Sequence, residues 1–512
     1  MTSASIHRRL SINSLANLIR YVVYVVVTFV MTPYTIRKLG LDDYGLWVLV
    51  LAIVGYGGLL ELGVQTSVIK LVAQKNAAND HDGLQRVVST AYAFFQGVGA
   101  LIACALVLVA PFFVSRLVSS PAEQETVRLL LIILGINAAI CFPAYVLGGV
   151  IYGMQRYVVK SGVDVVLAVV NAGLTFVVLE QGKGIVGLAL VKMAVDIASI
   201  AALFLLTKRI LPGLKIRLRT ASALSFSELL RLGGKIFISS TTTRIATHSE
   251  PVIISAILSN AWTTVFSVPK RLVDYVKQIS VTASLGFMPM FSELQGLGDT
   301  AQIARLYEQY TRYILIMIIP FVSCTMVLGG PFIRLWVGDE LAAKGGNLVV
   351  YLSAAFLIDS LQPLVWRLMI GVGRVDFLVK VSAAGSIAYL FLAALLVHWL
   401  GVEGIGIAAV IMTVFNQACY LPHICRFLDI SPIRHLIECQ LRPLIVWVLV
   451  TFLLYGMAQV VGTSSYSKIL ILPSLLFVIY FIVAYQFLLH PNERGFCMQK
   501  IKYVRMKIWS NL

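Results

Sequence analysis

The most informative residues of this chain are charged side chains inside two long apolar stretches, residues 227–258 and 261–290. A charge at the centre of a membrane-spanning helix costs about 2.5–3.5 kcal/mol on insertion scales, so it is kept only beside water, a partner or a ligand. Arginine is always charged, and its forked guanidinium suits phosphate and carboxylate groups. The stretches therefore predict an anion-binding site inside a membrane. Their charged residues are Lys235, Arg244, His248 and Glu250 in the first, and Lys270, Arg271, Asp274 and Lys277 in the second.

Two of these arginines are expected near the middle of the bilayer. At a helical rise of about 1.5 Å per residue, Arg244 lies about 18 Å along a helix that starts near Leu232. Arg271 lies about 15 Å along a helix that starts at Ala261, and the hydrocarbon core is about 30 Å thick. We therefore predict that the arginines converge on a cationic, substrate-binding cavity. Its predicted members are Arg20, Lys235, Arg244, Lys270, Arg271 and Lys277.

Arg20 belongs to a polar stripe in the first apolar stretch of the chain, residues 12–36. Polar residues recur there every three or four positions, which places them on one face of a helix. They are Asn13, Asn17, Arg20, Tyr24, Thr28 and Thr32. We expect so polar a face to line the cavity rather than to contact lipid. The alternative is that Arg20 extends along the helix to the cytoplasmic head groups.

Glu61 is the first acidic residue that the apolar stretches enclose. It lies one turn from Gln65 and follows the glycine-rich segment 55–58. Two roles fit it. It is either a protonatable or cation-coupling site, or the counter-ion of Arg20 or Lys70.

Other acids in these stretches differ in whether the sequence supplies a partner. Lys192 and Asp196 are four residues apart, so they can neutralise each other on one helix, which favours a structural pair. Asp164 and Asp359 have no partner that the sequence identifies. Like Glu61, these residues are candidates for energy coupling or for balancing charge.

The second charged stretch keeps a surplus of positive charge. Asp274 lies one turn from both Lys270 and Lys277 and compensates part of it, as a further candidate counter-ion. Arg271 has no opposite charge four residues away on its helix. A cavity with surplus fixed cations attracts anions. The structural alternative is that these charges hold the two halves of the protein together by salt bridges.

The composition places these charges in a membrane protein. Of 512 residues, 59% are hydrophobic and 13% are charged, and the mean hydropathy is +0.88, outside the range of soluble domains. The net charge of +17 is explained by basic cytoplasmic loops, so no nucleic-acid partner is predicted. The seven scattered cysteines form no Cys-x-x-Cys motif and are interpreted as small apolar residues. No metal site and no cofactor are predicted.

Apolar windows of about 20 residues recur along the whole chain, each long enough to cross a bilayer as a helix. We predict an all-α polytopic membrane protein with about fourteen transmembrane helices. They cover residues 12–36, 44–70, 87–114, 126–153, 159–180, 185–208, 227–258, 261–290, 303–330, 347–371, 376–400, 402–425, 442–462 and 468–490. Basic residues concentrate in the loops on one side of this arrangement. We therefore expect both termini in the cytoplasm.

The sequence also contains an internal repeat. Pro111 and Pro331 each follow a small residue and precede Phe. Pro143 and Pro363 are separated by the same number of residues as Pro111 and Pro331. Each copy holds six predicted helices, an even number, so both copies enter the membrane from the same side and are parallel repeats. Halves related in this way rock against each other around a central site, which gives alternating access.

The repeat divides the chain into two six-helix lobes and a C-terminal extension. We predict an N-terminal lobe at residues 1–208, a basic cytoplasmic linker at 209–226 and a C-terminal lobe at 227–425. Residues 426–512 hold an extra helix pair and a tail that mixes basic and apolar residues. We expect this tail to lie on the anionic inner leaflet.

Three features of the sequence resemble the polysaccharide exporters of the multidrug/oligosaccharidyl-lipid/polysaccharide (MOP) superfamily, and within it the Wzx-type flippases. They are the opening helix from Asn13 to Arg20, the segment KLGLDDYGLW at 38–47 and the segment LLRLG at 229–233. The resemblance covers residues 10–425. It implies two six-helix lobes in a V shape. It also implies transfer of undecaprenyl-diphosphate-linked oligosaccharide from the cytoplasmic to the periplasmic leaflet of the bacterial inner membrane.

This resemblance agrees with the charge pattern, because a lipid-linked diphosphate is a compact anion on an apolar tail. It implies a transporter rather than an enzyme, with the lipid-linked oligosaccharide, the bilayer and a polysaccharide polymerase as partners. Transport would be coupled to protons, sodium or the membrane potential. Fourteen helices also resemble the lipid II flippases of the same superfamily, in which an extra helix pair forms a lipid groove.

Two further functions remain as alternatives. A multidrug or organic-cation antiporter of the same fold should present acidic groups to its substrate, whereas the predicted cavity is cationic. Efflux of cationic dyes distinguishes these cases. A membrane glycosyltransferase or polymerase needs a sizeable extramembrane loop with carboxylates placed for acid–base chemistry, and the loops here are short and carry no paired acidic motif.

Overall fold

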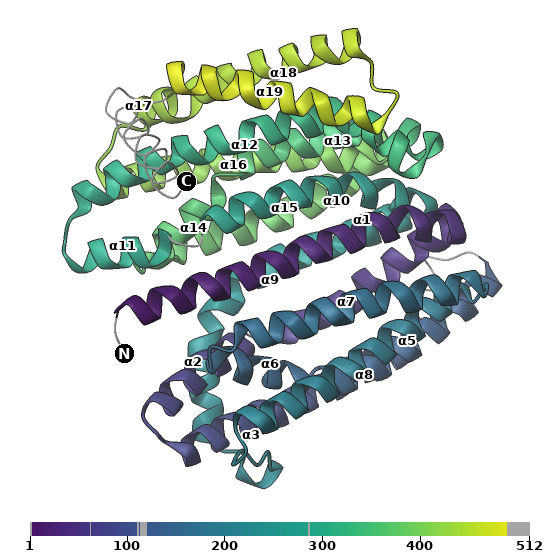
Figure 1. The fold of residues 1–512 in the computed structure, drawn as a ribbon, viewed down its shortest axis with the longest axis vertical. Helices are drawn as coiled ribbons and strands as arrows, with labels where there is room; N and C mark the ends of the chain where they lie inside the picture. Colours follow the sequence, from purple (N-terminus) through teal and green to yellow (C-terminus); the bar gives the residue numbers. More distant parts are fainter. Residues whose placement is uncertain (1–2, 62, 110–111, 113–119, 285–286, 489–512) are drawn as a thin grey trace, which may run out of the picture. The chain divides into compact units, whose positions relative to one another are not determined.

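The described part of the chain is helical throughout, with no strand (Figure 1). The structure, a computed structural model, describes residues 3–61, 63–109, 112, 120–284 and 287–488. Within them, eleven helical segments are long and apolar enough to cross a membrane. The predicted all-α polytopic class is thus confirmed, but the count of fourteen crossings is not. Helices α9 (Ala223–Ile257) and α10 (Asn260–Ala283) are not among the eleven, and the first two predicted helices fall in one segment, Ile19–Glu61.

The chain packs as two compact units, Met1–Ser267 and Val268–Leu512, which divide within α10. Besides α9, the first unit contains α1 (Ser3–Gly55), η1 (Tyr56–Glu61), α2 (Val64–Ala77), α3 (His81–Cys104), η2 (Ala105–Val109), α5 (Pro121–Cys141), α6 (Ala144–Gly153), α7 (Tyr157–Glu180), α8 (Gly184–Ile210) and η3 (Leu218–Thr220). The second contains α11 (Phe287–Gly296), α12 (Thr300–Val337), α13 (Asp339–Asp359), α14 (Gln362–Gly371), α15 (Asp376–Leu400), α16 (Glu403–Leu428), α17 (Pro432–His435), η4 (Leu436–Leu441), α18 (Arg442–Val461) and α19 (Tyr466–Phe487). The predicted lobes follow the sequence repeat rather than this packing, and their boundaries stay a prediction. The basic tail lies outside the described residues.

The first two predicted helices meet at a break in the structure. The break was expected between residues 36 and 44, and it lies at Gly40, whose backbone dihedral angles are not helical, so α1 consists of two helices that meet there. Gly40 has a φ of 83°, a left-handed value that glycine adopts freely and that costs other residues about 1–2 kcal/mol. Beyond this break, α1 contacts the start of α10, where Thr264 Oγ1 donates a hydrogen bond of 2.6 Å to the carbonyl oxygen of Leu41.

The core of the first unit lies between the second half of α1 and helices α2, α3, α5 and α6. Val68 and Phe95 are completely buried there. Gly149 of α6 approaches Val68 so closely that a Cβ atom would clash with it, which is how small residues let membrane helices pack. Helix α9 packs on α1, α2 and α3, and Ser67 Oγ donates a hydrogen bond of 2.9 Å to the carbonyl oxygen of Leu229. This packing positions the charged part of α9 against the first unit.

In the second unit α12 packs on α13, α13 on α16, and α16 on α15, and Figure 1 shows these helices side by side. Helices α18 and α19 lie on α12. Ser323 and Thr451 share a hydrogen bond of 2.9 Å between their hydroxyl groups, and the Tyr480 hydroxyl donates one of 2.8 Å to the carbonyl oxygen of Ile316. The predicted extra helix pair is therefore attached to α12 by polar contacts as well as by apolar packing.

Candidate functional site

The second predicted membrane helix, residues 44–70, is broken, and the break is the centre of a candidate site in the first unit. Helix α1 ends at Gly55, the 3-10 turn η1 follows, and α2 begins only after Gly63, which has a φ of 68°. Gly57 and Gly58 weaken the helix here, since glycine costs about 1 kcal/mol relative to alanine. A broken helix leaves carbonyl groups without intrahelical donors, which membrane proteins tolerate where the break is buried in protein or lines a cavity.

Arg244 of α9 supplies a donor to this break. Its Nη1 atom donates to the carbonyl oxygen of Gly58 at 2.9 Å and to Glu61 Oε2 at 3.4 Å. The side chain of Arg244 is 45% exposed and that of Glu61 is 17% exposed. Because a guanidinium has five N–H donors, further donors remain for a ligand. The structure thus pairs Glu61 with Arg244 rather than with the predicted Arg20 or Lys70.

Two more polar contacts hold α9 against the break. The hydroxyl groups of Tyr56 and Ser249 share a hydrogen bond of 2.5 Å. The ring of His248 packs directly on Gly55, where a Cβ atom would collide with it, and its centroid is 5.8 Å from that of Tyr56. The contacts of Tyr56, His248 and Ser249 with one another were not predicted from the sequence. His248 follows Arg244 by four positions and therefore lies on the same face of the helix. This spacing could have placed His248 beside Arg244 in the predicted site.

Arg20 is paired within the first unit with Asp164 of α7. Arg20 Nη1 lies 3.9 Å from Asp164 Oδ2, and Lys160, one turn earlier on α7, also binds Asp164. Ser161 Oγ donates to Asn17 Oδ1 at 3.3 Å and joins the same two helices. Asp164, for which the sequence identified no partner, thus has two. The four-residue spacing of Lys160 and Asp164 was the signal that could have found one of them.

The pair of Lys192 and Asp196 forms on α8 as the spacing predicted. Lys192 Nζ donates to Asp196 Oδ2 at 2.9 Å. Asn137 of α5 donates to the same oxygen at 2.8 Å. Asn137 could not be predicted as a partner, because a single Asn in an apolar stretch has no informative spacing. The carboxylate therefore connects α8 to α5.

In the second unit Lys277 of α10 binds Asp359 at the end of α13. Lys277 Nζ donates to Asp359 Oδ2 at 2.8 Å, and the exposed fractions of the two side chains are 44% and 17%. One turn further along α10, Ser280 Oγ donates to the carbonyl oxygen of Ser360 at 2.7 Å. Asp359, which had no partner in the sequence analysis, is thus a counter-ion supplied from another helix.

The other predicted cavity residues of α9 and α10 are placed as follows. Asp274 lies 3.8 Å from Lys270, one of its two predicted partners. Asp274 does not form the predicted contact with Lys277, because Lys277 binds Asp359 of α13 instead. Arg271 is half-buried on α10, and its convergence with the arginines of the first unit stays a prediction. The side chain of Lys235 lies outside the described residues.

Four of these ion pairs share one geometry, in which the acid is more buried than the base. They are Arg20–Asp164, Lys192–Asp196, Arg244–Glu61 and Lys277–Asp359. The carboxylate holds the base in place while the cationic head stays accessible. Half-exposed ion pairs add only about 0–1 kcal/mol to stability. Charged residues inside apolar helices are candidate functional residues.

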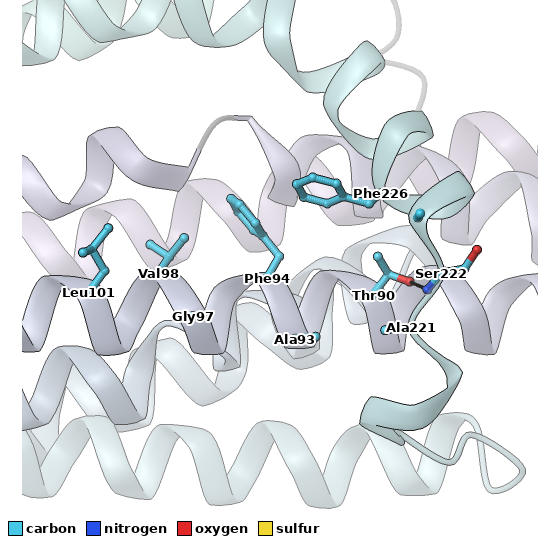
Figure 2. A pocket seen from close by; sticks show the side chains of 10 residues that line it. Thr90, Ala93, Phe94, Gly97, Val98, Leu101, Ala221, Ser222 and Phe226 are labelled. Carbon is cyan, nitrogen blue, oxygen red and sulfur yellow. Dashed lines mark hydrogen bonds between the residues drawn. The ribbon is translucent and has the colours of Figure 1, made fainter.

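An apolar hollow of about 550 Å³ lies elsewhere on the first unit, between α3 and the start of α9 (Figure 2). The ring centroids of Phe94 and Phe226 are 5.6 Å apart beside it. At one end the backbone N–H of Ser222 donates to Thr90 Oγ1 at 3.0 Å. The residues that line the hollow carry no charge. It suits an acyl or prenyl chain rather than a diphosphate and is not the predicted anion site.

Two sequence comparisons identify relatives of this chain. The sequence profile of the family described as polysaccharide biosynthesis protein matches residues 36–343. A Shigella flexneri protein assigned as an O-antigen transporter is 20% identical over 404 residues, which cover 77% of this chain and 93% of the relative.

Two solved structures have a similar fold. An inward-facing multidrug resistance MATE family transporter of the MOP superfamily aligns with a TM-score of 0.68 and 15% identity, over 80% of this chain and 98% of the transporter. The lipid II flippase MurJ, in an inward closed conformation, aligns with a TM-score of 0.66 and 13% identity, over 93% of this chain and 99% of MurJ. At these identities the likeness concerns the fold, and it confirms the fold expected from the resemblance.

Proposed function

Because the chain belongs to the polysaccharide biosynthesis protein family, we propose that it is a flippase that moves lipid-linked oligosaccharide across the bacterial inner membrane. The observation that carries this proposal is the pair of accessible bases, Arg244 on α9 and Lys277 on α10, each held by a more buried carboxylate. Charge-assisted, bidentate hydrogen bonds make arginine well suited to a diphosphate. The similarity to an O-antigen transporter supports the same substrate class.

We place binding of the diphosphate head group on Arg244. In the structure its charge is balanced by Glu61, so a substrate diphosphate must compete with this carboxylate for the guanidinium. Binding of the substrate would thus separate Glu61 from Arg244, and release would restore the pair. We propose that transport is coupled to protons, sodium or the membrane potential.

Transfer of a labelled prenyl-diphosphate oligosaccharide in proteoliposomes tests the function. We expect the wild-type protein to move the label between leaflets. Arg244→Ala should lower the rate at least about tenfold, since a hydrogen bond to a charged group contributes about 1.5–3 kcal/mol. Lys38→Ala is the matched control, because Lys38 forms an ion pair with Glu180 at 2.8 Å in the same unit. Normal transfer by Arg244→Ala would remove Arg244 from the mechanism, and no transfer by the wild type would contradict the function.

A lipid II flippase is the second candidate, favoured by the extent of one structural match. The likeness to MurJ extends over 93% of the chain, and the part left uncovered is smaller than α18 and α19 together. The match therefore includes at least part of the extra helix pair. Supplying lipid II and an O-antigen-type lipid-linked oligosaccharide in the same proteoliposome assay separates the two candidates by the ratio of their rates.

The helices make this a multi-pass membrane protein, and we propose that both termini face the cytoplasm. Basic loops support this orientation. Alkaline phosphatase fused after Gly462, between α18 and α19, should then be active, and the same enzyme fused after Leu428 should be inactive. The reverse result would invert the topology. A polysaccharide polymerase, acting on the delivered oligosaccharide, is the proposed partner, and co-purification from the membrane tests it.

A further inference from the structure

A buried cluster in the second unit has the composition of a metal site. Glu308 of α12, His435 of α17 and Cys439 of η4 place one donor atom each within 4.8 Å of one another. His435 is completely buried and Cys439 is 1% exposed. Carboxylate, imidazole and thiolate are the groups that bind Zn²⁺ in proteins. None of these residues takes part in the ion pairs assigned to transport.

The ring nitrogens of His435 are buried without hydrogen-bond partners among the described residues. Nδ1 lies 3.8 Å from Glu308 Oε1, which is too long for a hydrogen bond. A buried polar group left in this state costs about 1–3 kcal/mol. The ring is held by stacking on Tyr307, with centroids 5.3 Å apart and planes 11° from parallel.

The separations of the donor atoms suit ligands of one ion. Tetrahedral Zn²⁺ has bonds of about 2.0–2.1 Å to nitrogen and oxygen and about 2.3 Å to sulfur, so two ligand atoms lie about 3.3–3.6 Å apart. The distance of 3.8 Å between His435 and Glu308 is close to this range. All the donor atoms lie within 4.8 Å of one another, so side-chain movements of about 1 Å bring them to ligand distances.

The charges and the local backbone also fit a divalent cation. A neutral imidazole, a carboxylate and a thiolate carry two negative charges together, which one Zn²⁺ balances. Arg312 Nη1 donates to Cys439 Sγ at 3.6 Å. His435 immediately precedes the π-helix η4, which contains Cys439. Segments of π-helix occur frequently at functional sites.

We propose that Glu308, His435 and Cys439 bind one Zn²⁺ ion, which fastens the connection between α16 and α18 to α12. A water molecule would complete the four ligands, as in zinc sites with three protein ligands. The site would stabilise the second unit where the extra helix pair begins. The proposal does not depend on the transported substrate.

Cobalt binding to the full-length protein, purified in detergent without a polyhistidine tag and stripped with EDTA, tests this proposal. We expect one Co²⁺ per chain, with a thiolate-to-cobalt charge-transfer band in the near ultraviolet that Zn²⁺ abolishes. Cys439→Ser should remove the band, and His435→Gln should weaken binding at least tenfold. Cys425→Ser is the matched control, because Cys425 is fully buried on α16 and lies outside the donor set.

A variant that keeps Cys439 as its sole cysteine makes the result independent of whether Cys439→Ser folds. The band must persist in this protein, because the only thiol left is the proposed ligand. Its absence from a monodisperse single-cysteine protein would overturn the proposal. So would an equal band in Cys439→Ser and wild type, or no uptake of Co²⁺ and Zn²⁺ by the wild type. In the last case His435 and Glu308 form an ion pair without a metal.

Discussion

The carboxylate of Glu61 both positions Arg244 and competes with any anion for it. Glu61→Gln keeps an acceptor beside the guanidinium but removes the charge, and so imitates the protonated acid. We expect the variant to bind a prenyl-diphosphate oligosaccharide about tenfold more tightly and to transport it more slowly, because release is no longer assisted. Binding affinity and the initial rate of transport measure the two effects.

Glu180→Gln is the control for this prediction. Glu180 also forms an ion pair with a base in the first unit, Lys38, but it lies outside the break in the second predicted helix. Both its binding and its transport should match the wild type. If Glu61→Gln binds no more tightly than Glu180→Gln, the competition between Glu61 and substrate does not exist.

The sequence supplied partners only where both residues are one turn apart on one helix. Lys192 and Asp196 could be paired from their spacing alone. Glu61 and Arg244 lie on segments that are far apart in the sequence and meet only through the packing of α9 on α1 and α2. The cluster of Glu308, His435 and Cys439 could not be predicted from the sequence either. The spacing of His435 and Cys439 is common in helices, and Glu308 comes from a different helix, α12.

At the scale of single elements, the second part of α1 packs on the start of α10 through a close backbone contact. Gly45 lies so near the carbonyl oxygen of Asn260 that any Cβ atom would overlap it. Gly45→Ala should therefore destabilise the protein by about 1–3 kcal/mol, because a backbone atom cannot rotate away. Gly173→Ala is the control within α7, where a Cβ atom meets nothing within 4 Å. It should raise stability by about 0.5–1 kcal/mol. Thermal unfolding in detergent measures both, and equal effects would contradict the contact.

The N-terminus of α3 makes the connection after α2 sensitive to pH. Asp80 Oδ1 accepts a hydrogen bond of 2.8 Å from the backbone N–H of Gly83, and Oδ2 lies 3.0 Å from Lys75 Nζ. The hydrogen bond from Gly83, followed by Lys75, lowers the pKa of Asp80 from its ordinary value. The ionised cap therefore stabilises α3 above the ordinary carboxyl pKa, and this contribution disappears as the pH falls through the lowered pKa.

Hydrogen exchange at the Gly83 amide measures this effect. We expect exchange, corrected for its intrinsic rate, to accelerate below about pH 4 in the wild type, near the ordinary pKa of aspartate. Asp80→Asn should keep the cap, because asparagine is an equally good N-cap, and should remove the pH dependence. The same pH dependence in both proteins would exclude Asp80 as its origin.

The apolar stretches 126–153 and 347–371 were each predicted as one helix, but in the structure each is divided into two helices. Helices α5 and α6 have 21 and 10 residues, and α13 and α14 also have 21 and 10. Both pairs divide beside the repeated prolines, Pro143 and Pro363, since proline lacks the N–H that a helix interior needs. The break at η1 was missed, because glycine is common in membrane helices and Gly57 and Gly58 alone do not indicate a break.

At the scale of the whole molecule, the open question is whether the two compact units act on one substrate. Arg244 belongs to the first unit and Arg271 to the second. If both arginines bind the same diphosphate, removing one changes what the other contributes, and their effects on affinity do not add. If they act on different groups or at different steps, the effects add. Alternating access by two halves around one site requires the first case.

A double-mutant cycle on substrate affinity distinguishes these cases. We expect Arg244→Ala and Arg271→Ala each to weaken binding of a prenyl-diphosphate oligosaccharide about tenfold. The double variant should deviate from the product of the two effects by about twofold or more, because contacting groups on one ligand couple by at least about 0.5 kcal/mol. Arg244→Ala combined with Arg128→Ala, an exposed residue of α5, gives the additive reference. If the effects of Arg244→Ala and Arg271→Ala on affinity add as fully as those of the reference pair, the two arginines do not bind the same diphosphate. Binding of the head group would then be assigned to the first unit alone.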